Sequence, residues 1–131
     1  IHLAKPALNR LQVWTYYQSL SLQPMRDAAR ALVGIHGFGA FCKQDPVPDR
    51  LDCHIYDADW TEQGAEWVFE IEANRFLRHM VRILVGTMVD VGRSNRPPED
   101  IAVLLASGKR ADAGPTAPAR GLCLLWVAYG T

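Results

Sequence analysis

Apolar and polar residues follow different periods in different parts of the chain. From Pro24 the apolar positions recur every three or four residues, which predicts a short amphipathic helix over 24–33 with Gly34 as its stop. Residues 66–73 instead alternate, and together with the apolar run at 51–60 they predict a β-hairpin with one face exposed to water. The turn of that hairpin is expected at 61–64, where the sequence is polar and ends in glycine.

The second half of the chain contains the longest helical pattern. Residues 75–92 are apolar around most of the helical circumference, so we expect a long helix that is largely buried. A shorter helix over 98–107 follows two prolines, and Gly108 ends it. The run 122–129 is apolar on both faces, as is typical of a central strand, while residues 1–22 show little periodicity and are interpreted as a lead-in segment.

These patterns predict an α+β fold, in which a mostly antiparallel sheet packs with helices. A chain of 131 residues that is 49% hydrophobic can bury one substantial core, so residues 1–131 are expected to form one domain, or half of a larger one. Between the first helix and the hairpin, glycines interrupt the segment 36–41, and we expect Phe38 and Phe41 to pin this loop to the core.

Charge and cysteine content narrow the classes of function. Fourteen Lys and Arg balance fourteen Asp and Glu, so any nucleic-acid site must come from local clustering of positive charge. The three cysteines have no metal-binding spacing, which predicts buried thiols in a reducing compartment and no metal site. No segment approaches the ~20 apolar residues of a membrane span, and no signal peptide is visible, so a soluble, cytoplasmic protein without a membrane partner is expected.

A basic stripe is predicted along the long helix. On a helical wheel, Arg75, Arg82 and Arg93 fall on one side, and Arg78 and His79 flank them. Two interpretations stay open for this basic stripe. It is either the solvated face of an amphipathic helix or one wall of a groove that binds an anionic partner.

Two residues of this helix favour the groove. Arg82 lies between apolar residues on both sides, and an arginine in such surroundings costs several kcal/mol unless it meets a carboxylate or a phosphate. Gly86, one turn further, lowers helix stability by ~1 kcal/mol relative to alanine, which indicates that another group approaches the backbone closely there.

Two segments resemble signatures of one enzyme family. They are EANRFLRHMVRILVGT at 72–87, continued by VGR at 91–93, and AGPTAPARGLCL at 113–124. Both resemble the C-terminal half of TruA-type tRNA pseudouridine synthases, and they occur in the expected order with an amphipathic helix between them. The resemblance is strongest over 66–129 and extends more weakly to 25–41.

The resemblance implies an activity and a division of roles. Members of this family isomerise uridine to pseudouridine in the anticodon stem-loop of tRNA, act as homodimers and use no cofactor. A catalytic aspartate lies in their N-terminal half, and an arginine and a leucine of the C-terminal half complete the site. By motif position these are Arg82, which would pair with the aspartate, and Leu122, which would pack in the base pocket. The residues expected to bind RNA phosphates are Arg75, Arg78, His79 and Arg93.

The catalytic aspartate is not expected in this chain. Asp112 is the nearest look-alike, but it lies beside the Gly-Pro-Thr-Ala-Pro loop rather than in the family's aspartate motif, so it is interpreted as a decoy. The chain alone is therefore predicted to be inactive and to need the N-terminal half as a partner. The alternative hypothesis is an RNA-binding or assembly module that has the same half-fold and performs no chemistry.

Overall fold

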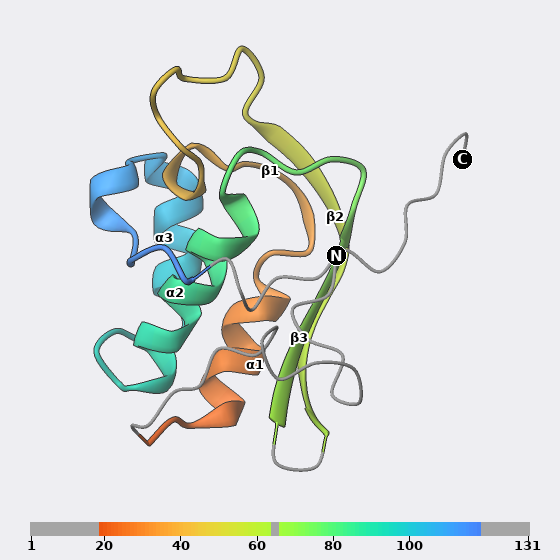
Figure 1. Cartoon of the computed structure of the whole chain (residues 1–131), viewed down its shortest axis with the longest axis vertical. Helices are drawn as coiled ribbons and strands as arrows, with labels where there is room; N and C mark the ends of the chain where they lie inside the picture. The colour runs from red at the N-terminus through yellow and green to blue at the C-terminus, as the bar shows by residue number, and fades with distance from the viewer. Residues whose placement is uncertain (1–18, 64–65, 119–131) are drawn as a thin grey trace.

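The fold is described by a computed structural model over residues 19–63 and 66–118. Three α-helices pack with one antiparallel sheet of strand order β1-β2-β3, which confirms the α+β prediction. In Figure 1, α1 lies between α2 and the long β2–β3 hairpin. The elements, in chain order, are α1 (Leu22–Arg30), β1 (Gly34–Gly37), the 3-10 helix η2 (Gly39–Phe41), β2 (Asp52–Gln63), β3 (Glu66–Ala73), α2 (Met80–Gly92), α3 (Asp100–Ser107) and the 3-10 helix η3 (Arg110–Asp112).

Strand β2 changes the phase of its alternation halfway along. Ile55 is buried, and beyond it the buried positions are Ala58 and Trp60 rather than odd-numbered residues. The pairing with β3 shifts by one residue between Ile55 and Asp57, so Tyr56 is the extra residue of a β-bulge. The bulge lets apolar side chains stay buried on both sides of it, at Cys53 and Ile55 before it and at Ala58 and Trp60 after it.

The hairpin differs from its prediction in two respects. β2 runs to Gln63, and Thr61 pairs with Val68, so most of the turn predicted at 61–64 is strand. The prediction of one water-exposed face is wrong at Val68, which is only 1% exposed although it alternates with the buried Phe69. Strand pairing extended β2 through polar residues that carry a turn signal when they are considered alone.

The core lies between the helices and one face of the sheet. Trp60 and Phe69 stack with ring centroids 5.1 Å apart, and Trp60 Nε1 lies 3.3 Å from Met88 Sδ on α2. Phe38 and Phe41 are fully buried, which confirms that they pin the glycine-rich loop. The short strand β1 inside that region was not predicted, because glycines at both of its ends hide the strand signal.

Cys42 and Cys53 are free and buried thiols, as the sequence predicted.

The helix bounds differ slightly from the predicted ones. α1 begins at Leu22, two residues before its predicted start, and α3 ends at Gly108 with φ 67°, the left-handed conformation that favours glycine. The strand expected at 122–129 and most of the lead-in segment lie outside the described residues. Within the described ranges, no helix combines the length and apolarity needed to span a membrane.

The long helix begins later than predicted. α2 starts at Met80 rather than at residue 75, because the chain stays attached to β2 beyond the end of β3. Asn74 forms two hydrogen bonds with the backbone of His54. The Asn74 backbone N–H donates to the His54 carbonyl, and the Asn74 side-chain oxygen accepts from the His54 N–H. His79 then adopts φ 63°, which no α-helix can include.

Candidate functional site

One side of α2 binds a loop from the C-terminal part of the chain. Every residue of α2 is buried except Arg82 and Asp90, which confirms the prediction of a largely buried helix. The loop over 113–117 packs against α2 along Arg82, Gly86 and Thr87. The first signature segment therefore packs against the described part of the second, at residues 113–117.

Arg82 holds the loop by two hydrogen bonds. Its side-chain Nε–H donates to the Ala117 carbonyl at 2.8 Å, and its own carbonyl accepts from the Ala117 N–H at 2.9 Å. The sequence predicted a deeply buried Arg82, but its side chain is only half-buried. The Ala117 carbonyl satisfies one of its guanidinium nitrogens. Among the described residues, no carboxylate lies within ion-pair distance of Arg82. The Nη groups remain available to a further acceptor.

Two glycines let the loop and the helix approach closely. A methyl group on Gly86 would overlap the Pro115 carbonyl oxygen and lie 2.7 Å from its carbon. A methyl group on Gly114 would lie 2.8 Å from the Thr87 Cα. The prediction that another group approaches the Gly86 backbone is confirmed, and that group is the chain's own loop.

The side chains of Thr87 and Arg110 also form hydrogen bonds with this loop. The Thr87 hydroxyl accepts from the Gly114 N–H at 2.9 Å and donates to the Ile83 carbonyl at 2.8 Å. Arg110 donates from Nη1 to the Gly114 carbonyl at 2.9 Å and from Nη2 to the Thr116 hydroxyl at 3.3 Å. Thr87 is fully buried, and its hydroxyl provides the buried Gly114 N–H with a hydrogen-bond partner.

A basic cluster lies around the start of α2 and consists of Lys43, Arg78, His79 and Arg82. The Lys43 N–H donates to the Arg78 carbonyl at 2.9 Å, which places the two segments side by side. The pKa of His79 is lowered, first by desolvation and then by the positive charges of Arg82, Lys43 and Arg78. The sequence did not single out Lys43, because only tertiary pairing brings its loop to α2.

The basic stripe predicted along one helix face is not a single surface. Arg75 precedes α2 and donates to the carbonyls of Arg50 and Asp52, where it ties down the start of β2. Arg93 follows α2 as its C-cap, about 17 Å along the axis from Arg82 at 1.5 Å per residue. Of the stripe, only Arg82 lies within the helix itself.

Two other candidate residues have separate outcomes. Asp112 is exposed in η3, and within the described part of the chain no ion pair joins it to Arg82. Leu122 lies outside the described residues, so its predicted place in a base pocket stays a prediction.

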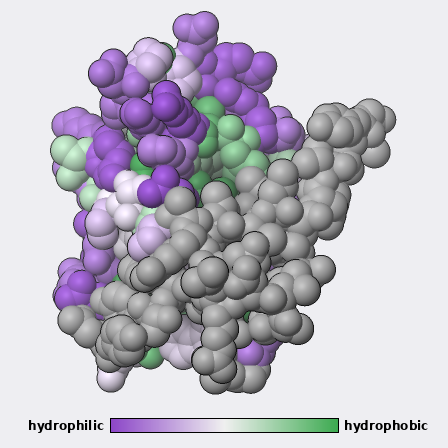
Figure 2. All heavy atoms as spheres, in the orientation of Figure 1, coloured by the Kyte–Doolittle hydropathy of each residue, from purple (hydrophilic) through white to green (hydrophobic). Residues whose placement is uncertain are grey.

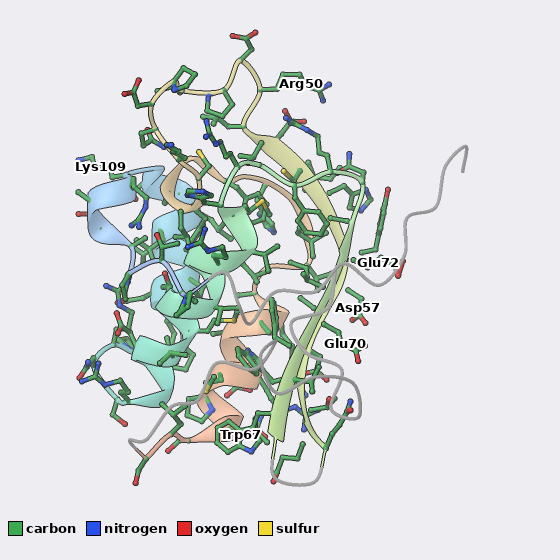
Figure 3. The ribbon with its side chains drawn as sticks, in the orientation of Figure 1. Arg50, Asp57, Trp67, Glu70, Glu72 and Lys109 are labelled. Atoms are coloured by element: carbon green, nitrogen blue, oxygen red, sulfur yellow. The ribbon has the colours of Figure 1, made fainter. Side chains whose placement is uncertain are left out.

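The hairpin carries a group of acidic side chains. Figure 3 shows Asp57, Glu70 and Glu72 projecting from the hairpin on the side away from the helices. Figure 2 shows hydrophilic surface over the loop between η2 and β2, which carries charges of both signs: Lys43, Asp45, Asp49 and Arg50. A net charge of zero thus conceals a basic region at the start of α2, as the sequence analysis required of any nucleic-acid site.

Comparison with known proteins gives a consistent set of relatives. A family model described as tRNA pseudouridine synthase matches residues 28–130. The chain is 47% identical over 117 residues to the tRNA pseudouridine synthase A of Syntrophotalea carbinolica, covering 88% of the chain and 46% of that protein. The corresponding protein of Bacteroides thetaiotaomicron is 39% identical over 129 residues, covering 96% of the chain and 48% of the relative. The chain spans about half the length of the curated relatives it matches.

Proposed function

Because the chain belongs to the tRNA pseudouridine synthase family, we propose that it forms one half of an enzyme that isomerises uridine to pseudouridine in the anticodon stem-loop of tRNA. The observation that carries this proposal is the state of Arg82. Its Nε is bound to Ala117. Within residues 19–63 and 66–118 its two Nη groups have no acidic partner, so they can form a bidentate pair with a carboxylate. The complementary aspartate comes from the N-terminal half, which is joined to this chain in the full-length protein.

In the proposed reaction the aspartate attacks or assists at the glycosidic bond of a flipped-out uridine. The bond from C1′ to N1 breaks, the base turns, and a bond from C1′ to C5 forms as any bond between the aspartate and the sugar breaks. C5 loses its hydrogen as a proton and N1 takes up a proton, so the product is an isomer of uridine. Arg82 keeps the carboxylate ionised and oriented, because an opposite charge at close range favours the charged form. The reaction uses no cofactor.

The RNA is held by positive charge around this site. Within the basic cluster, Arg78 and Lys43 contact phosphates of the anticodon arm, independently of base identity. Arg93 supplies a separate contact at the far end of α2, while Arg75 supports the fold by holding the start of β2. Leu122, which follows the loop in the sequence, is proposed to form a wall of the base pocket. The proposed partners are tRNA, the N-terminal half and a second copy of the protein, in the cytoplasm.

Arg78 and His79 are expected to contribute differently to tRNA affinity. Arg78→Ala should reduce the slope of log K against log salt by about one, as loss of a phosphate contact does. His79→Asn, which tolerates the left-handed backbone, should leave affinity at pH 7.5 within about 2-fold, because a histidine whose pKa is lowered is neutral there. Filter binding over a salt series measures both.

The pH dependence of binding gives a second test of His79. Protonation adds a positive charge only below its lowered pKa, so wild-type affinity should rise as the pH falls towards about 5.5, and the His79→Asn variant should show a smaller rise. If Arg78→Ala and His79→Asn reduced tRNA affinity equally at pH 7.5, the assignment of a positive Arg78 and a neutral His79 would be wrong.

The proposed function is tested by tritium release from tRNA labelled with [5-³H]uridine. The full-length protein is expected to release tritium, and this chain alone is expected to release none. The competing hypothesis is an RNA-binding or assembly module without chemistry. Full-length protein that binds tRNA but releases no tritium would establish that hypothesis instead.

A further inference from the structure

The orientation of the Arg82 guanidinium depends on a chain of hydrogen bonds that begins away from the reacting atoms. Arg82 Nε donates to the Ala117 carbonyl, so the position of that carbonyl fixes the plane of the guanidinium. Ala117 belongs to a loop without regular secondary structure, and contacts made elsewhere along the loop determine where its carbonyl lies.

Those contacts converge on Gly114 and Thr116. The Thr87 hydroxyl on α2 accepts from the Gly114 N–H, and Arg110 in η3 donates to the Gly114 carbonyl. Both backbone polar groups of Gly114 are therefore bound by side chains. Arg110 also donates to the Thr116 hydroxyl, one residue before Ala117. The loop is thereby held at both ends of its contact with α2.

We propose that Thr87 and Arg110 are positioning residues of the reaction, which hold the loop over 114–117 so that Arg82 presents its Nη groups to the incoming carboxylate. This inference rests on the proposed function, because it assumes that Arg82 pairs with a carboxylate of the N-terminal half. Neither residue touches the substrate. Lys43 and Arg78 act together with Arg82 on His79, the Asp90 carboxylate lies beside Gly114, and the variants below change none of these groups.

The experiment measures kcat and KM against pH in the full-length protein, by tritium release from labelled tRNA. Thr87→Val removes the hydroxyl, and Thr87→Ser keeps it. The Thr87→Val variant should lower kcat by about 10-fold with KM within about 2-fold, since a misplaced catalytic group lowers turnover rather than binding. The acid limb of its kcat profile should move to higher pH, because a carboxylate with a displaced cationic partner has a higher pKa. The Thr87→Ser variant should match the wild type.

A second variant keeps the proposal testable if Thr87→Val fails to fold. Arg110→Lys preserves the positive charge, but one ammonium group cannot reproduce the two-armed contact. It should move the acid limb in the same direction. An acid limb that stays in place in every variant that folds, whatever its activity, overturns the positioning role. A wild-type protein without tritium release instead contradicts the proposed function itself, so the two failures are distinguishable.

Discussion

Arg82→Ala in the full-length protein is expected to lower kcat for tritium release by about 10²–10³-fold or more, the range for loss of one preorganised electrostatic group. The dissociation constant for tRNA should change by less than about 3-fold. The reason is geometric: Arg82 is half-buried and bound to the loop, so its charge acts on the carboxylate rather than on phosphates. Steady-state kinetics and filter binding on the same preparation measure the two quantities.

Two further variants make the Arg82 prediction specific. Arg30 is an exposed arginine at the end of α1 that pairs with Asp27 at 3.8 Å, and Arg30→Ala should leave kcat within about 2-fold, as surface substitutions usually do. Arg82→Lys keeps the charge but loses the planar fork and should be nearly as damaging as alanine. Near-normal turnover by Arg82→Ala would refute the pairing role.

Gly86→Ala is expected to lower the free energy of unfolding of the chain by about 2–3 kcal/mol, the range for overpacking a close contact. Helix propensity alone predicts the opposite sign, because alanine is favoured over glycine by about 1 kcal/mol within a helix. The new methyl group would overlap the Pro115 carbonyl, and backbone atoms of a docked loop cannot move aside as a flexible side chain can. Urea denaturation followed by circular dichroism gives the difference.

Gly37→Ala is the matched control for this stability prediction. A methyl group at Gly37 would have no heavy atom within 4 Å, so the substitution should change stability by less than about 0.5 kcal/mol. If Gly86→Ala were as stable as the wild type, the loop would not be docked on α2 as described.

The helices and the hairpin were predictable because their signals are local. Periodicity placed α3 and β3 close to their observed bounds, but it could not find the start of α2. That start is determined by Asn74 and Arg75, whose hydrogen bonds reach residues 20 and 23 positions away in the sequence. A helical wheel assumes that the pattern is helical throughout, and this assumption joined Arg75 to a basic stripe that does not exist.

The candidate site was predictable only in its separate parts. Gly86 correctly indicated that another group lies close to the α2 backbone, because a glycine inside a helix lowers its stability and usually has a packing or functional role. The resemblance to the family identified Arg82. Neither could show that the approaching group is the loop of the second signature. The roles of Lys43, Thr87 and Arg110 depend on contacts across the fold, and their residue types carry no signal of those contacts in the sequence.

We propose that Arg82 is one half of an ion pair whose carboxylate lies outside residues 1–131. A crystal structure of the full-length protein would test this pairing through the distance from the Arg82 Nη atoms to the nearest carboxylate oxygen. We expect an aspartate of the N-terminal half within about 4 Å, the limit for an ion pair, with Arg82 Nε still bound to Ala117. Nη groups that face only solvent, or that pair with an acidic residue of this chain such as Asp112, would contradict it.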